Sequence, residues 1–458
     1  MFLLQIRMNQ RKKMIKPVQF ICLSFFLIIM LGTFLLMLPF SSATHTVTPF
    51  TDSLFTATSA TCVTGLSVYD TYSHWSPAGQ GIILLLIQVG GLGFVTFSTS
   101  VVLSLRGRLG LHDMRLAREQ VSLQNLGDIE QLFTNILRVT VICEGSGALL
   151  LCIPFISRVG ASGIWMAVFT AVSSYCNAGF DIFGFISPNC SITPFLGDWI
   201  VMTVVPALII LGGIGFVVFQ DIFTCRKRKK SAHHLSTYSK VVLVMSGVLI
   251  LFGFLSILGI EWNQTLADLP FGEKVSAAFF SSVTARTAGY SAINYLAASP
   301  LTKIVTILLM FIGASPVSTG GGIKTTTAVV LIMTMLSVLR GQDDTIVAGH
   351  RIKKAVVYKA LSLTVLSTAL VTAATTFLWF TEPGNSFLNL AVVVVSAFST
   401  TGLTTIDLGS IHTISKLTLC MLMYIGRVGP FSFILTLRLR NKRIDKQVTL
   451  PEADLIVG

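Results

Sequence analysis

The chain has 458 residues, of which 53% are hydrophobic and only 12% are charged. Soluble domains carry about 25% charged residues, so this composition excludes an ordinary soluble enzyme or binding module and indicates a surface that faces lipid. The net charge of +13 would suit nucleic acid, but most of the 33 Lys and Arg residues are grouped in short segments between long apolar runs. That alternation is the positive-inside pattern of membrane proteins, and it leaves nucleic acid a remote alternative.

The first long apolar run is Val18–Leu38. Its 21 residues exceed the apolar core of a signal peptide, so we expect a true span and no cleaved signal. The eight cysteines are scattered, without the spacing of metal ligands or of a disulfide framework. Cys62 and Cys176 are therefore interpreted as small residues with backbone roles and not as reactive thiols.

A short apolar segment, Phe50–Ala60, leads into Thr61-Cys62-Val63-Thr64-Gly65-Leu66. Eleven residues of helix cover roughly 16 Å, about half of the hydrocarbon core of a bilayer. A half-crossing helix that ends in a Thr/Gly-rich run is a re-entrant loop, because non-helical backbone at this depth survives only inside protein or beside water. Carbonyl oxygens of such a loop can replace the water of a cation, which the negative end of the helix also favours.

The same arrangement recurs four times along the chain. Gly65, Gly179, Gly289 and Gly402 lie 114, 110 and 113 residues apart, and each precedes a large apolar or aromatic residue. A short apolar segment precedes each of the three later loops: Trp165–Ser174, Val275–Val283 and Ala391–Phe398. A near-constant period over four copies indicates an internal repeat.

Each repeat is predicted to contain a span, a re-entrant loop and a second span. The remaining spans are Gly79–Leu105, Gln131–Phe155, Trp199–Phe223, Val241–Ile260, Leu301–Leu339, Ala355–Phe380 and Thr413–Leu437. The fold class is thus an all-α integral membrane protein with eight transmembrane helices and four re-entrant loops. The predicted repeats are residues 17–107, 129–225, 241–340 and 355–438, with cytoplasmic linkers at 108–128, 226–240 and 341–354 and cytoplasmic tails at 1–16 and 439–458. We also expect a surface helix at Leu111–Val121.

The second spans share closely spaced glycines. The runs Gly90-Gly91-Leu92-Gly93 and Gly212-Gly213-Ile214-Gly215 match, and Gly313 and Gly426 hold related places in the later repeats. Small residues let helices approach closely, which suffices to explain the first two runs.

The third repeat departs from this pattern. Its second span, Leu301–Leu339, has 39 residues, and a helix of that length would be roughly 58 Å long, far more than one crossing needs. The excess corresponds to residues 313–323, where four glycines and a proline cannot propagate a helix, so we expect irregular backbone in a cavity or pore. A nucleotide-binding P-loop is excluded, because Ile323 separates Gly322 from Lys324 and no strand precedes it.

Two arginines lie at unusual places. Arg427 falls within the last span, where a charge normally faces a wet interior or a partner; snorkelling to the cytoplasmic face is the alternative. Arg286 lies at the edge of the third loop, where it could brace the outer mouth of a pore.

Together these residues resemble the Trk/Ktr/HKT superfamily of potassium transporters, and most closely the membrane (KtrB-type) subunit of the bacterial Ktr potassium-uptake system. The resemblance covers nearly the whole chain. It rests on the first loop, on Asn177-Ala178-Gly179-Phe180, on Arg286-Thr287-Ala288-Gly289-Tyr290, on Gly320-Gly321-Gly322-Ile323-Lys324-Thr325-Thr326 and on Gly426-Arg427-Val428-Gly429-Pro430.

The resemblance implies one pore per chain, surrounded by the four repeats with pseudo-fourfold symmetry. It implies a potassium-binding selectivity filter made of Thr61, Cys62, Val63, Thr64, Gly65, Cys176, Asn177, Ala178, Gly179, Thr287, Ala288, Gly289, Ser399, Thr400, Thr401 and Gly402. It also implies an intramembrane gate made of Gly313, Ala314, Ser315, Pro316, Val317, Ser318, Thr319, Gly320, Gly321, Gly322, Lys324 and Arg427. A serine in place of the first filter glycine is associated with sodium passage in plant relatives, so Gly65 favours potassium.

The resemblance further implies a homodimer in the plasma membrane, with both termini in the cytoplasm. This dimer would sit on a cytoplasmic ring of nucleotide-binding (KtrA-type) subunits that open the pore. Potassium would be the substrate, sodium a candidate activator, and no nucleotide would bind to this chain itself.

The main alternative is a secondary solute or sodium-coupled transporter that binds its substrate at the broken helix 301–339. Such transporters show paired broken helices in inverted halves, whereas this sequence predicts four parallel repeats and one break. No nucleophile–base pair or metal-ligand cluster indicates an enzyme, and the seven histidines are dispersed. The sequence therefore favours a channel-like potassium-uptake pore.

Overall fold

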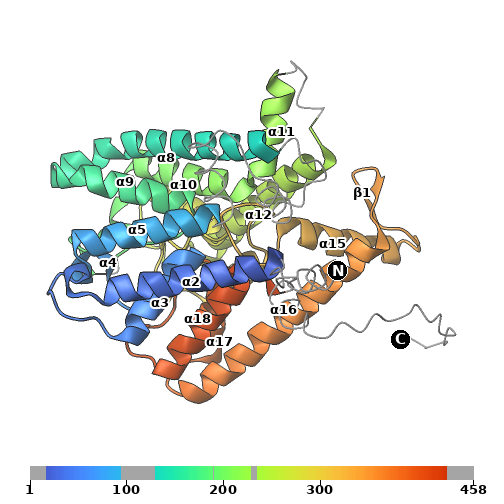
Figure 1. The fold of residues 1–458 in the computed structure, drawn as a ribbon. Coiled ribbons are helices and arrows are strands. Elements are labelled where there is room, and N and C mark those ends of the chain that lie inside the picture. Colours follow the sequence, from blue (N-terminus) through green and yellow to red (C-terminus); the bar gives the residue numbers. More distant parts are fainter. Residues whose placement is uncertain (1–16, 94–128, 189, 228–234, 431–458) are drawn as a thin grey trace, which may run out of the picture.

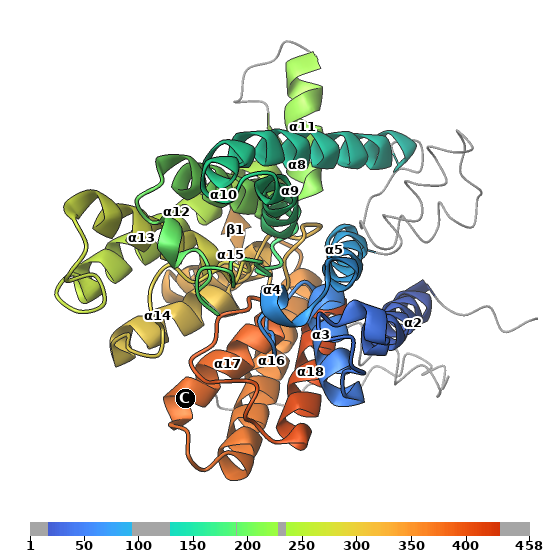
Figure 2. The same ribbon diagram turned by 90° about the vertical axis from the view of Figure 1, so that its left-hand side faces the viewer.

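The computed structural model describes residues 17–93, 129–188, 190–227 and 235–430. Within these ranges the protein is almost entirely helical (Figure 1), and its one sheet is a two-stranded hairpin. Figure 2 shows the molecule from the left-hand side of Figure 1. In this view the helices form four groups that follow one another in chain order around a common centre.

The first two repeats share the order long helix, short helix, second helix. Repeat one contains α2 (Pro17–Met37), η1 (Pro39–Ser41), α3 (Phe50–Cys62), α4 (Thr71–His74) and α5 (Pro77–Leu92). Repeat two contains α8 (Ile129–Val159), α9 (Ser162–Tyr175), η2 (Thr193–Phe195), α10 (Trp199–Ile214) and α11 (Phe216–Lys227).

The last two repeats have the same plan. Repeat three contains α12 (Thr237–Glu261), α13 (Phe271–Thr284), α14 (Pro300–Phe311) and α15 (Thr325–Leu339), followed by the antiparallel strands β1 (Ile346–Val347) and β2 (His350–Arg351). Repeat four contains α16 (Lys354–Thr381), α17 (Phe387–Ser399) and α18 (Thr413–Val428).

The first helix of each repeat is long and apolar enough to cross a bilayer. These spans are Gln19–Met37, Thr134–Val159, Thr237–Glu261 and Lys354–Thr381. Only 39%, 33%, 28% and 22% of their apolar windows are buried, so most of these side chains face outward. An apolar outer surface of this kind is one that lipid covers. The predicted all-α membrane fold is confirmed.

The short helices α3, α9, α13 and α17, here called the central helices, lie inside this outer layer. They have 13 or 14 residues each, a length of about 20 Å that cannot cross a bilayer. Nearly all of α3 and α17 beyond their first turns is buried. The four re-entrant helices predicted from the sequence are therefore present at the predicted places.

Carboxylates cap the second helices of repeats three and four. Glu261, at the end of α12, accepts hydrogen bonds from the backbone N–H of Ser299 (2.9 Å) and the hydroxyl of Thr302 (2.5 Å) at the start of α14. Glu382 accepts from the backbone N–H of His412 (2.8 Å) in the same way before α18. A negative group here satisfies unpaired N–H donors and favours the positive helix end, which fixes the corner between consecutive helices.

The predicted continuous span Trp199–Phe223 is wrong. The helix ends at Ile214, and α10 and α11 meet at an angle of 90°. Gly215 is the cause, because its φ of 98° cannot continue a right-handed helix. The break in repeat two means that the expectation of a break in repeat three alone is also wrong. Gly93 (φ 78°) and Gly429 (φ 94°) end α5 and α18, close to the limits of the described residues.

Smaller differences concern the linkers. Helix α12 begins at Thr237, inside the predicted linker 226–240, because Ser236 caps it by accepting a hydrogen bond from Ser239 N–H. The predicted linker 341–354 contains the β1–β2 hairpin. The surface helix predicted at Leu111–Val121 lies outside the described residues.

Candidate functional site

Four glycines meet where the repeats converge. Gly65, Gly179, Gly289 and Gly402, here called the glycine ring, have φ values of 90°, 70°, 86° and 101°. A β-carbon on each would collide with the carbonyl oxygen just before the glycine of the next repeat; these carbonyls belong, in order, to Ala178, Ala288, Thr401 and Thr64. The contacts run from repeat one through four and return to one, so they close a ring of backbone. Only glycine fits both the conformation and the space.

The residue two positions before each ring glycine is also left-handed. Val63, Asn177, Thr287 and Thr400 have φ values of 58°, 59°, 83° and 52°. None is glycine and three are β-branched, and this conformation costs on the order of 1–2 kcal/mol per residue. Strain repeated at one position in four loops is typical of a functional backbone.

A serine in the last turn of a central helix holds the ring in repeats one and four. Ser59 accepts a hydrogen bond from the backbone N–H of Gly65 (3.1 Å), and Ser396 accepts one from Gly402 N–H (2.9 Å). Each serine lies six residues before its glycine.

In repeats two and three a hydroxyl also bonds to the loop backbone, but as a donor to the carbonyl of the residue after the ring glycine. Ser173 donates to the carbonyl of Phe180 (2.7 Å), and Thr284 donates to the carbonyl of Tyr290 (2.8 Å). These hydroxyls were not predicted from the sequence, although a serine lies six residues before the ring glycine in three of the four repeats.

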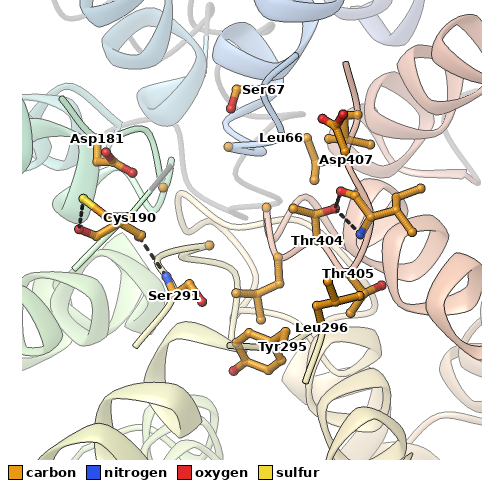
Figure 3. A pocket seen from close by; sticks show the side chains of 18 of the residues that line it. Leu66, Ser67, Asp181, Cys190, Ser291, Tyr295, Leu296, Thr404, Thr405 and Asp407 are labelled. Carbon is orange, nitrogen blue, oxygen red and sulfur yellow. Dashed lines mark hydrogen bonds between the residues drawn. The ribbon is translucent and has the colours of Figure 1, made fainter. Parts of the chain in front are cut away.

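A hollow of about 960 Å³ opens on one side of the ring, and all four ring glycines line it. Residues from every repeat surround it, including Ser67, Asp181, Tyr295 and Thr405 (Figure 3). The ring therefore forms the floor of a wide, partly polar space.

Residues 313–323 lie against the other side of the ring. A β-carbon on Gly320 would meet the side chain of Thr287, and one on Gly321 would meet that of Thr400. Both threonines precede their ring glycines by two positions, so this segment, here called the intramembrane loop, touches the ends of loops three and four that face away from the hollow.

The intramembrane loop is also tied to repeat two and to α12. The backbone N–H of Phe216, just after the break between α10 and α11, donates to the carbonyl of Val317 (2.9 Å). The Tyr238 hydroxyl, in the first turn of α12, donates to the carbonyl of Pro316 (3.1 Å). The bend of repeat two thus provides a bonding partner that a straight helix could not offer.

Arg427 points inward and does not snorkel. Its guanidinium donates to the carbonyls of Thr319, Gly90 and Gly91, the last at 3.0 Å. These bonds join the intramembrane loop to the end of α5. Lys324 adds a further bond from its ammonium to a loop carbonyl (2.7 Å). Within the described residues neither side chain forms an ion pair, so backbone carbonyls balance both charges.

Arg286 does not face the hollow. Its guanidinium donates to the backbone carbonyl (3.3 Å) and the hydroxyl (3.2 Å) of Ser246, in the middle of α12. It also lies beside Ala314 of the intramembrane loop. The interpretation of Arg286 as a brace of the outer mouth is wrong, because its side chain turns back toward α12.

Comparison with known proteins identifies this arrangement. The family described as "TrkH: Cation transport protein" matches residues 4–445. The chain belongs to the TrkH family. It is 38% identical to the potassium/sodium uptake protein NtpJ of Enterococcus hirae, over 98% of each chain. It is 34% identical to the Ktr system potassium uptake protein B of Bacillus subtilis, over 98% of this chain and 99% of that one.

The fold of this TrkH-family chain is also similar to a solved structure. The crystal structure of the potassium transporter TrkH from Vibrio parahaemolyticus matches with a TM-score of 0.73, covering 95% of this chain and 86% of that chain at 16% identity. The likeness supports the fold. Membership of the family makes the protein a transporter and not an enzyme. In the described part of the chain, no group of three or more His, Cys, Asp or Glu could hold a metal ion.

A buried ion pair joins repeats one and four of this TrkH-family fold. The Lys416 ammonium, on α18, lies 2.9 Å from Asp52 Oδ1 in the first turn of α3, and it also contacts the carbonyl of Gly409 (3.3 Å). The Tyr69 hydroxyl donates to the other oxygen of Asp52 (2.7 Å). The start of α3 is therefore held by two neighbours.

Three carboxylates line the hollow: Asp70, Asp181 and Asp407. Burial raises the pKa of Asp181 to about 7, a hydrogen bond from Phe183 N–H (3.2 Å) opposes the rise, and the Asp70 carboxylate adds to it. Because the pKa of Asp181 is near 7, the negative charge on the walls of the hollow changes with pH around neutrality. Negative charge there raises the local concentration of cations.

Proposed function

We propose that this chain is the pore-forming subunit of a channel-like potassium-uptake system, with the glycine ring as the narrow part of the ion path. The observation that carries the proposal is the closed ring of backbone, in which each repeat contributes one glycine and the neighbouring carbonyl. The C-terminal, negative ends of all four central helices precede these loops, which favours a cation at the centre. The residues assigned to the filter from the sequence, 61–65, 176–179, 287–289 and 399–402, make up this region.

Oxygen ligands suit the proposed cargo. Potassium is bound in such pores by oxygen atoms that replace its hydration shell. Besides the loop carbonyls, the hydroxyl oxygens of Thr61, Thr64 and Thr400 are buried without a hydrogen-bond partner. These atoms have spare capacity for a cation that has lost its water. The names of the relatives, one a potassium uptake protein and one a potassium/sodium uptake protein, support potassium as the substrate and sodium as a second cation to test.

We assign the gate to the intramembrane loop, residues 313–323, with Lys324 and Arg427. The closeness of Gly320 to Thr287 and of Gly321 to Thr400 supports this assignment, because a loop at this place beneath the ring would obstruct the ion path. Arg427 latches the loop to α5, and opening requires exchange of its hydrogen bonds. Glycines supply the backbone freedom for that movement.

The printed names of two relatives, Ktr system potassium uptake proteins B and D, support a proposal about the assembly. We infer a homodimer in the plasma membrane, with both termini in the cytoplasm, docked on a ring of KtrA-type nucleotide-binding subunits. The docking surface is assigned to the cytoplasmic segments with Arg106–Arg118, Arg226–Lys230 and His350–Lys354. This chain binds no nucleotide itself. A secondary transporter with a substrate site at the broken helix is less well supported, because α5, α10, α14 and α18 all end at related positions, so repeat three is not distinct in this respect.

Flux of rubidium and sodium into proteoliposomes tests the proposal. Purified chain should admit rubidium in preference to sodium, driven by an inside-negative potential worth about 2.3 kcal/mol per charge per 100 mV. Addition of the nucleotide-binding subunit should increase this flux. Full, ligand-responsive flux without that subunit would contradict the proposed regulation, and absence of any cation flux would contradict the pore.

A further inference from the structure

A lysine near the start of the second helix makes matching contacts in two repeats. Lys416 lies four residues after the N-cap of α18 and contacts Asp52. Lys303 lies four residues after the N-cap of α14, and its ammonium donates to Asn389 Oδ1 and to the carbonyl of Leu296, both at 3.0 Å.

The correspondence extends to the partners of both lysines. Each lysine contacts the carbonyl seven residues before it, Leu296 for one and Gly409 for the other. Asn389 and Asp52 each lie 13 residues before the ring glycine of their repeat. Lys303 therefore reaches from repeat three to the first turn of the central helix of repeat four, as Lys416 reaches from repeat four to repeat one.

Asn389 is connected to the ring by a second bond. The Thr405 hydroxyl donates to the backbone carbonyl of Asn389 (2.8 Å). Thr405 follows Gly402 by three residues and lines the hollow. Hydrogen bonds thus connect Lys303, the start of α17 and the segment that follows Gly402, while Lys303 itself does not line the hollow.

Stability alone does not explain a lysine at this position. Lys303 is only 7% exposed, and it forms no ion pair among the described residues. Burial of an ammonium against neutral oxygens is costly compared with burial of an apolar side chain. Repeat two has an apolar residue at the equivalent position: Met202 lies four residues after the N-cap Asp198 and is buried.

We propose that Lys303 is a positioning residue for cation discrimination. Through its bond to Asn389, which is also bonded to Thr405, Lys303 holds α17 in its position along and about the helix axis. It thereby holds Gly402 in its position in the glycine ring. The central helix is short and its last turn is bonded to Gly402 through Ser396, so a shift at its first turn reaches the ring. This inference rests on the proposed function of the ring.

The test is Lys303→Met, which keeps an unbranched side chain only one atom shorter and removes its donor. We expect sodium flux relative to rubidium to rise about threefold, because loss of the charged donor removes a strong hydrogen bond that holds the first turn of α17 in place. Asn389→Leu, which removes the acceptor, should give a similar ratio, and the double variant should be no worse than either single one. Lys303→Arg keeps a donor and should retain the wild-type ratio.

Met202→Leu is the matched control, because it alters the equivalent position of repeat two where no such bond exists. All variants are compared at equal amounts of folded protein, so a loss of stability alone leaves the flux ratio unchanged. A wild-type ratio in Lys303→Met refutes the inference, and if that variant does not fold, Asn389→Leu decides in the same way. Gly65→Ser distinguishes failure of the inference about Lys303 from failure of the proposed function. If Gly65→Ser also leaves the flux ratio unchanged, the ring is not the filter and the proposed function fails as well.

Discussion

Replacement of a ring glycine by serine tests the proposed ion path most directly. Gly65 has a φ of 90°, and a β-carbon there would collide with the carbonyl oxygen of Ala178. The new side chain can be accommodated only if that carbonyl or the loop moves. Because both belong to the ring, Gly65→Ser should change its geometry while the spans remain folded.

The structure gives the scale of the effect. Left-handed backbone at a residue other than glycine costs on the order of 1–3 kcal/mol, and the collision adds to this. If a difference of 1–3 kcal/mol enters the relative barriers for potassium and sodium, their flux ratio changes by about 5- to 150-fold. We expect the sodium flux to rise relative to the potassium flux. A distorted ring no longer holds its oxygen atoms at the spacing that suits potassium, so it discriminates less against the smaller ion.

The assay is rubidium and sodium flux into proteoliposomes at matched protein content. Two controls separate the causes. Gly81→Ser adds the same side chain in repeat one where no atom lies within 4 Å, and Gly341→Ser adds it at a φ of 68° far from the ring, again with no atom within 4 Å. Both should retain the wild-type ratio. An unchanged ratio in folded Gly65→Ser would refute the reasoning that this backbone discriminates between cations.

Three further predictions address the gate, the hydroxyl support and the hollow. Deletion of residues 315–321 should raise rubidium flux and reduce its dependence on the nucleotide-binding subunit, and Arg427→Ala should do so more weakly because the obstruction remains; unaltered or lower flux in both folded variants would place the gate elsewhere. Ser396→Ala removes the hydroxyl that accepts from the ring backbone, at a cost of about 1–3 kcal/mol for the unpaired N–H, so thermal stability and the rubidium preference should both fall, and no change in either would contradict this role. Because the pKa of Asp181 is raised to about 7, its carboxylate gains a proton as the pH on the side of the hollow falls from about 8 to about 6, so rubidium flux at low concentration should decrease over this range; a pH profile that Asp181→Asn leaves unchanged would show that another group is responsible.

Local features of the sequence were enough to predict the repeat and its elements. The long apolar runs determine the first helices, since each is already the length of a bilayer. The ring glycines could be identified because they recur at spacings of 114, 110 and 113 residues, each after a short apolar segment. The run 313–323 could be recognised as irregular because its glycines and proline prevent a helix whatever surrounds them.

Only the tertiary structure decided the contacts between repeats. Gly215 permits the break in repeat two, but the Val317 carbonyl that accepts a hydrogen bond from the N–H of Phe216 lies about 100 residues away, and the sequence does not reveal such a partner. The direction of Arg286 and the bond between Lys303 and Asn389 likewise join residues 40 and 86 positions apart. Sequence periodicity specifies which face or turn of a helix a residue occupies. The distance between two residues on different helices depends instead on how the whole helices pack against each other. The closed glycine ring therefore exists only once all four repeats are in position.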